Sequence, residues 1–276
     1  MSNAAEQQYA EQGIVYLDPK MRIKNYWTQR SHSFAELRVR ELNSIMADRW
    51  LREIAKYIPA GGQLRILDIG TGTGFFAFLL SSLGHRVTGI DLTPSMIQEA
   101  KEIGQTLHSS AQFRVMDAEK LLFADESFDM VISRNLTWTL PHPQEAYREW
   151  QRVLKPGGRF VGSTYGNAHM KEISMLVSDF DSRIVLSADR LYEKFGKQNG
   201  GKILEKFFSD VSWSEYEDYL EVTKPESLIS YVLSCHGNQN RFIVDRYNDF
   251  VSFVKKKTKY GFDVTKEAGV FRAVKK

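Results

Sequence analysis

About a quarter of the way along its 276 residues, the chain reads Ile66-Leu67-Asp68-Ile69-Gly70-Thr71-Gly72-Thr73-Gly74. An apolar strand that ends in an acid leads into three glycines at alternate positions, and a helix opens at Phe75. Glycine tolerates positive φ and has no side chain to hold a ligand away from the backbone. The run therefore predicts a strand, a tight turn and a helix whose N-terminus faces a ligand across the strand end.

The glycine spacing and a second acid narrow the kind of ligand. The dinucleotide fingerprint places its third glycine three positions after the second, and that position here is Phe75. The run Arg86-Val87-Thr88-Gly89-Ile90-Asp91 reads as a buried strand that ends in an acid, 23 positions after Asp68. Doubly wound folds place a ribose-binding carboxylate at about this spacing. Turn and acid together predict a cofactor that carries a ribose.

Strand and helix signals alternate through the first two thirds of the chain. Ser33-Phe34-Ala35-Glu36 has the pattern of a capping box and predicts the start of a helix that runs to Ile58, after a polar and broken segment 1–30. Strands are expected at 64–68, 86–90, 113–116, 128–133 and 159–164, and helices at about 74–83, 94–104 and 143–154. This alternation predicts an α/β fold with a parallel sheet covered on both faces.

The pattern changes after Tyr165. Residues 167–208 read mainly as helix, followed by strand patterns at 211–216 and 219–222. Helices are expected at about 225–235 and 241–259, and the last β segments at 262–264 and 270–274.

Composition sets limits on function. With 42% hydrophobic and 26% charged residues, the chain has the composition expected of a soluble globular protein. Its net charge of +3 is too small to indicate binding to nucleic acid by itself. A single cysteine, Cys235, excludes an internal disulfide and a paired-cysteine metal site, and no metal is expected. The first residues show no basic-then-apolar leader pattern, Ser2-Asn3-Ala4 resembles a cloning scar, and no apolar run reaches 18 residues. We therefore expect a cytoplasmic protein without a membrane partner.

From about Tyr26 to Val274 the chain resembles the class I methyltransferases that use S-adenosylmethionine, and among them the type 11, UbiE-like small-molecule enzymes. The matching motifs are the glycine-rich run, Asp91, Met116-Asp117-Ala118-Glu119, Ser127-Phe128-Asp129 and Leu154-Lys155-Pro156-Gly157-Gly158. The resemblance implies a doubly wound, Rossmann-like sheet of seven mostly parallel strands in the order 3-2-1-4-5-7-6, the last strand antiparallel. We expect an N-terminal helical cap over residues 1–60, a methyltransferase domain over 61–276, and a helical insertion over about 167–208.

The resemblance implies S-adenosylmethionine as cofactor and S-adenosylhomocysteine as product. The three glycines of the turn would hold the methionine part. Asp68 would either bind the amino group of the cofactor or hold the turn through its N–H groups. Asp91 would accept both ribose hydroxyls, and its alternative role is to cap the helix that Thr93-Pro94 begins.

Further contacts to the cofactor are expected along the strand ends. Asp117 would accept the adenine amino group, with Ala118 as a backbone donor, unless Asp117 is only a polar strand end. Met96 would line the adenosine or belong to the core. The expected cofactor-binding residues are Tyr26, Asp68, Gly70, Thr71, Gly72, Gly74, Asp91, Leu92, Met96, Asp117, Ala118, Arg134 and Asn135.

The acceptor is expected beside the segment from Ser133 to Leu140, because open α/β sheets bind ligands at the carboxyl ends of their strands. This segment lacks the Asn/Asp-Pro-Pro-Tyr tetrapeptide with which amino-methylating nucleic-acid enzymes bind a flipped base. The expected substrate pocket consists of Trp27, Trp138 and Tyr165, although Trp138 has packing against the next helix as its alternative. Tyr26 and Trp27 would form an aromatic lid.

Catalysis by a general base is not obvious from the sequence. Holding a reactive methyl in line with its acceptor can supply about 7–11 kcal/mol through proximity alone. His169 is the first candidate base, followed by His142 and His32. The predicted function is methyl transfer to a small molecule by a monomer or homodimer, with no nucleic-acid partner. The alternatives are an RNA or protein methyltransferase, and a catalytically silent module that binds S-adenosylmethionine.

Overall fold

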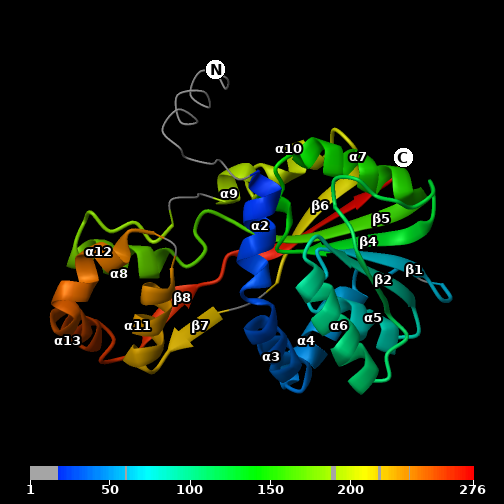
Figure 1. Ribbon diagram of the computed structural model, residues 1–276. Helices are drawn as coiled ribbons and strands as arrows, with labels where there is room; N and C mark the ends of the chain where they lie inside the picture. Colours follow the sequence, from blue (N-terminus) through cyan, green and yellow to red (C-terminus); the bar gives the residue numbers. More distant parts are fainter. Residues whose placement is uncertain (1–17, 60, 188–190, 217–218, 236) are drawn as a thin grey trace, which may run out of the picture. The chain divides into compact units, whose positions relative to one another are not determined.

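A computed structural model describes residues 18–59, 61–187, 191–216, 219–235 and 237–276 (Figure 1). The chain divides into two compact units: one runs to Leu136 and includes 140–158, and the other comprises Thr137–Thr139 and Arg159–Lys276. The expected division into a cap over 1–60 and a domain over 61–276 stays a prediction, and residues 1–17 and 60 of that cap lie outside the described residues. Within the described residues, no helix combines the length and the apolar character needed to cross a membrane.

The first unit is built on four parallel strands. They are β1 (Arg65–Ile69), β2 (Arg86–Asp91), β3 (Gln112–Val115) and β4 (Phe128–Arg134). Strand β1 lies between β2 and β4, and β2 also pairs with β3, all in parallel register. Ile66, Leu67 and Ile69 are completely buried, as a strand covered on both faces requires. The glycine-rich turn thus follows a central strand of the sheet.

Helices connect these strands and precede them. They are α2 (Pro19–Thr28), α3 (Ser31–Leu42), α4 (Ile45–Ala55), α5 (Phe75–Ser82), α6 (Pro94–Thr106) and α7 (Pro143–Val153). Three of them, α2, α6 and α7, begin with proline, whose fixed φ and missing N–H suit the first helical position. Helix α5 buries its first six residues, so the helix that follows the glycine turn is fixed within the core.

The second unit adds antiparallel strands. Strand β9 (Ala268–Val274) pairs antiparallel with both β5 (Leu154–Tyr165) and β6 (Ser209–Glu215). The seven strands follow the order β3-β2-β1-β4-β5-β9-β6. Since β9 is the last strand along the chain, this is the predicted order 3-2-1-4-5-7-6 with its antiparallel last strand, and the prediction is confirmed.

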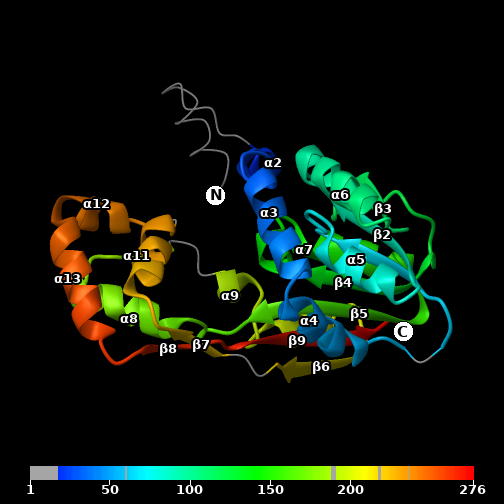
Figure 2. The same ribbon diagram turned by 90° about the horizontal axis from the view of Figure 1, so that it is seen from below.

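A smaller sheet in the second unit differs from expectation. Strands β7 (Tyr219–Val222) and β8 (Phe262–Thr265) pair with each other, so the segment 262–264 does not belong to the seven-stranded sheet. The reason is a separate apolar core, in which Val264 is 2% exposed. Around the two strands lie helices of this unit (Figure 2). The remaining helical elements are η1 (Thr137–Thr139), α8 (Lys171–Phe180), α9 (Leu191–Lys194), α10 (Gly200–Leu204), α11 (Pro225–Ser234), α12 (Gln239–Ile243), η2 (Val244–Arg246) and α13 (Tyr247–Lys257).

The N-terminal helices begin and end at other residues than predicted. Ser33 lies inside α3, and its hydroxyl donates to the carbonyl of Arg30 at 3.1 Å, so the predicted capping box is wrong. A helical cap was expected over 1–60, but the start of α2 was not located within the polar segment 1–30; Asp18 and the following proline provide that start. The predicted single helix to Ile58 breaks at Ser44, which caps α4 by accepting the Met46 N–H at 3.2 Å.

These caps give a first prediction. Ser44→Ala removes the N-cap of α4 and should lower the free energy of unfolding by about 1 kcal/mol. Ser33→Ala, the matched change inside α3, should cost less than about 0.5 kcal/mol, because it removes no cap. Urea unfolding of both variants measures the difference. Equal losses would mean that Ser44 does not act as a cap.

Candidate active site

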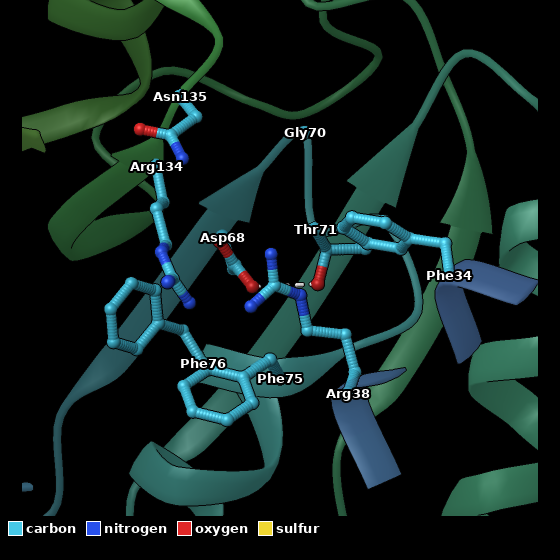
Figure 3. Close-up of a pocket in the computed structure, with 10 residues that line it drawn as sticks. Phe34, Arg38, Asp68, Gly70, Thr71, Phe75, Phe76, Arg134 and Asn135 are labelled. Carbon is cyan, nitrogen blue, oxygen red and sulfur yellow. Dashed lines mark hydrogen bonds between the residues drawn. The ribbon is translucent and has the colours of Figure 1, made fainter. Parts of the chain in front are cut away.

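A cavity of about 60 Å³ lies at the carboxyl end of β1, within the first unit (Figure 3). Its walls come from α3, the glycine-rich turn, the start of α5 and the end of β4. The lining residues are Phe34, Arg38, Asp68, Gly70, Thr71, Gly72, Phe75, Phe76, Arg134 and Asn135. Six of the predicted cofactor-binding residues are therefore brought together: Asp68, Gly70, Thr71, Gly72, Arg134 and Asn135.

The turn needs glycine for its backbone conformation. Gly70, Gly72 and Gly74 have φ angles of 70°, 55° and 90°. At Gly72 a Cβ would also lie 3.3 Å from the Phe34 ring, so a larger side chain would enter the cavity wall. The N–H groups of Gly70 and Thr71 both donate to the Ile90 carbonyl at 2.9 Å, which anchors the turn to β2.

Asp68 holds the turn and faces the cavity, and its binding of the cofactor's amino group stays a prediction. Its carboxylate is 2% exposed, accepts the Thr71 hydroxyl at 2.6 Å, and also lines the cavity. Burial raises the pKa of Asp68 to about 7, the nearby Asp91 adds to this rise, and the hydrogen bond from Thr71 and the charge of Arg134 oppose it. A positively charged ligand in the cavity would favour the ionised form.

Asp91 bonds to the glycine-rich turn and to the start of α6. One carboxylate oxygen accepts the Thr93 N–H at 2.8 Å and the other accepts the Gly72 N–H at 3.1 Å. Burial raises the pKa of Asp91, and these two bonds oppose the rise. Thr93, not Asp91, occupies the N-cap position of α6. A carboxylate oxygen can accept more than one hydrogen bond, so ribose binding by Asp91 stays a prediction.

The predicted adenine contacts lie beside an ion pair that the sequence did not reveal. Asp117 accepts the Lys20 ammonium group at 2.7 Å and the Glu119 N–H at 2.9 Å. The carbonyl of Ala118 accepts from Trp150 at 2.9 Å, whereas the Ala118 N–H has no partner among the described residues. The adenine roles of Asp117 and Ala118 stay predictions.

Glu119, His142 and Glu145 place potential metal-ligand atoms within 4.8 Å of one another. The Glu119 side chain is 2% exposed and lies 2.5 Å from the Lys20 ammonium group. It also accepts the His142 N–H at 2.7 Å. Glu119 therefore has polar partners within the protein, and its ion pair with Lys20 anchors α2.

The expected lid residues do not line the cavity. The Tyr26 ring lies under Arg30 at 4.0 Å and beside Trp27 at 5.1 Å, and Trp27 packs on Phe34 at 5.5 Å. It is Phe34 that reaches the cavity. Met96 is 2% exposed, which fits its alternative as a core residue, and Leu92 is half-buried.

Sequence reasoning missed Phe34 and Arg38. The two residues are one helical turn apart on α3 and share one face of it, and this spacing is the signal that could have identified them. The guanidinium groups of Arg38 and Arg134 both point into the cavity beside Asp68 (Figure 3). The cavity thus holds two cationic groups and one carboxylate.

Predicted acceptor-side residues come together in the second unit. The Trp138 ring lies 4.7 Å from Tyr165, and Tyr165 stacks on His169 at 4.9 Å. Burial, and secondarily Tyr231, raises the pKa of Tyr165 to about 12, so its phenol stays neutral. Trp27, the remaining predicted pocket residue, belongs to the first unit.

The two other candidate bases lie elsewhere, in the first unit. His142 pairs with Glu119, and the exposed His32 side chain pairs with Glu36 and Glu99. Neither histidine lines the cavity.

Comparison with known proteins shows which proteins the chain resembles. Residues 67–162 match a family model described as a methyltransferase domain, type 11. The chain is 40% identical over 122 residues to a malonyl-[acyl-carrier protein] O-methyltransferase of Erwinia pyrifoliae, covering 44% of this chain and 45% of that protein. It is 27% identical over 197 residues to a ubiquinone biosynthesis O-methyltransferase of Cereibacter sphaeroides, covering 66% and 79%.

A solved structure, the YcgJ protein from Bacillus subtilis, has the same fold, with a TM-score of 0.58 and 19% identity over 83% of this chain and 99% of that chain. The match with this chain covers about half or less of the first three curated relatives: 45%, 26% and 25% of their lengths.

The raised pKa of Asp68 gives a second prediction. In the unfolded chain its pKa is close to the ordinary 3.8, and in the folded protein it is about 7. The folded state therefore binds the proton of Asp68 more tightly than the unfolded chain does, and this proton stabilises the fold. The stabilisation is complete below about pH 4 and is lost as the pH rises to about 7. Relative to Asp68→Asn, the wild type should lose free energy of unfolding across this range.

Asp129→Asn is the control for this prediction. Burial raises the pKa of Asp129, but bonds from Lys155 and the Arg65 N–H outweigh it and lower the pKa. The difference in the free energy of unfolding between Asp129→Asn and the wild type should therefore stay constant between about pH 5 and pH 7. Urea unfolding at several pH values measures both. A constant difference between the wild type and Asp68→Asn would contradict the raised pKa.

Proposed function

We propose that this chain, whose residues 67–162 are a class I, type 11 methyltransferase domain, transfers a methyl group from S-adenosylmethionine to a small-molecule acceptor. The observation that carries the proposal is the cavity at the end of β1, where Asp68, Arg38 and Arg134 gather around the glycine turn. The methionine end of this cofactor has an ammonium group and a carboxylate. The charged groups of the cavity complement both.

The charges can be assigned to the two groups. The carboxylate of Asp68 suits the ammonium group, which would keep Asp68 ionised despite its burial. The guanidinium groups of Arg38 and Arg134 suit the carboxylate, since arginine binds carboxylates through paired N–H donors. The N-terminus of α5 adds about 0.3–1 kcal/mol for an anion near its first turn.

The size of the cavity fits only one end of the cofactor. Pockets that enclose a whole ligand of this size measure about 300–1,000 Å³, whereas this cavity measures about 60 Å³. The amino-acid end would occupy it, and the adenosine would extend along the ends of β2 and β3. Asp91, Asp117 and the Ala118 N–H lie at those strand ends and offer two carboxylates and one donor.

Catalysis would rest mainly on orientation. When bound, S-adenosylmethionine supplies an electrophilic methyl, which leaves as the acceptor bonds to it and S-adenosylhomocysteine remains. The residues of the turn would fix the direction of the transfer, which is worth about 7–11 kcal/mol through proximity. His169 would take the proton that the acceptor loses. Stacking on Tyr165 holds the imidazole ring of His169 in place.

Methyl transfer from labelled S-adenosylmethionine to a metabolite extract tests the proposal. Label should appear in the small-molecule fraction whether or not the extract has been treated with nuclease and protease. Loss of transfer after nuclease treatment would indicate an RNA substrate, and loss after protease treatment a protein substrate. Cofactor binding without transfer to any fraction would indicate a silent binding module.

Gly72→Val should abolish binding of S-adenosylhomocysteine, because Gly72 has a φ of 55° and a Cβ there would lie 3.3 Å from Phe34. Gly84→Val is the matched control: Gly84 has a φ of 86°, but nothing lies within 4 Å of the added Cβ. Both variants strain the backbone, and only the first fills the cavity wall. Calorimetry should show binding in the control alone. Binding by Gly72→Val would remove the turn from the site.

His169→Ala tests the proposed base. Turnover should fall by a factor of about 10²–10⁴, while the affinity for S-adenosylhomocysteine should not change. His32→Ala is the control, since the His32 side chain is 80% exposed. An unchanged rate in His169→Ala would leave orientation as the sole source of catalysis.

A further inference from the structure

Glu41 reaches both arginines of the cavity without lining the cavity itself. It lies three residues after Arg38 on α3, and its side chain is 14% exposed. One oxygen, Oε2, forms an ion pair with Nη1 of Arg38. The other, Oε1, lies 3.4 Å from Nη2 of Arg134 and accepts the indole N–H of Trp50 at 3.0 Å. One carboxylate thus connects α3, α4 and the end of β4.

Aromatic faces hold the same two cations. The Arg38 guanidinium lies 4.6 Å from the centre of the Phe34 ring. The Arg134 guanidinium lies 4.4 Å from Trp50 and 5.2 Å from Phe75. An aromatic face attracts a cation but does not set the direction of its N–H groups. The hydrogen bonds to Glu41 set that direction.

Among the four groups Arg38, Arg134, Glu41 and Asp68, the charges balance when Asp68 is ionised. Arg38 and Arg134 contribute two positive charges, and Glu41 and Asp68 contribute two negative ones. Without Glu41, two guanidinium groups would share one cavity and repel each other. A ligand end with one ammonium group and one carboxylate adds no net charge, so it fits a balanced site.

We propose that Glu41 is a positioning residue that aims Arg38 and Arg134 at the carboxylate of a ligand with an α-amino-acid end. The inference rests on the proposed function, because it concerns the same cavity. Glu41 acts through the arginines and does not touch the ligand. Its effect is therefore confined to ligands that carry the carboxylate.

Two ligands separate positioning from a purely structural role. S-adenosylhomocysteine carries the amino-acid end, and 5′-methylthioadenosine has the adenosine and the thioether but lacks that end. In Glu41→Gln the affinity for S-adenosylhomocysteine should fall about tenfold, as for the loss of one charged hydrogen bond. The affinity for 5′-methylthioadenosine should stay within about twofold. Calorimetry on the full chain measures both.

Glu36→Gln is the matched control on the same helix, because the Glu36 side chain is 60% exposed and pairs with His32. It should change neither affinity. Trp50→Phe covers the case in which Glu41→Gln does not fold, since it removes the indole N–H that donates to Glu41 and keeps an aromatic ring at that position. Trp50→Phe should lower the affinity for S-adenosylhomocysteine about threefold and leave that for 5′-methylthioadenosine unchanged.

Parallel losses for both ligands would show that Glu41 only supports the fold and would overturn the inference. Unchanged or tighter binding of S-adenosylhomocysteine in Glu41→Gln would overturn it as well, because the arginines would then not need Glu41. Failure of the proposed function is a different result: the wild-type protein would bind neither ligand.

Discussion

The hydrogen bond from the Thr71 hydroxyl to the buried Asp68 carboxylate is the constraint on which the site depends. It closes the turn on the end of β1, so that the glycines hold left-handed conformations that other residues rarely adopt. The same turn places the Gly72 N–H on Asp91, which connects β1 to β2. Burial of Asp68 is costly for a charged group, and a cationic ligand or the nearby Arg134 offsets that cost.

The N-terminal helices complete a cavity that the sheet begins. Helix α3 supplies Phe34 and Arg38, and Glu41 on the same helix balances the two arginines. Helix α2 is fixed to the end of β3 by Lys20, which bridges Asp117 and Glu119. Helix α3, which precedes the first strand, therefore provides one of the two arginines proposed for the carboxylate of the cofactor, and the end of β4 provides the other.

The strand–turn–helix around the glycines and the alternation of strands and helices could be predicted from sequence because they depend on local patterns: apolar runs, acids at strand ends and glycine spacing. The sheet order was expected only through the resemblance to a known family. Pairings between distant segments could not be predicted from local patterns. In the sequence, Arg38 and Glu41 indicate only a polar face of a helix. Their contact with Arg134 forms when the chain folds. The pairing of β8 with β7 depends on a separate apolar core, and no single sequence motif predicts that core. Ser33 matched a capping box by spacing alone, but the helix begins at Ser31.

We propose that the ends of β1, β2, β3 and β4, together with α3, hold one cofactor. Hydrogen–deuterium exchange of the full chain, with and without S-adenosylhomocysteine, tests it most directly. We expect slower exchange in the peptides covering 34–41, 68–76, 91–96 and 117–120 together, and unchanged exchange in the small sheet of β7 and β8. Slower exchange that leaves out 68–76, or no change in any of these peptides at saturating ligand, would contradict it.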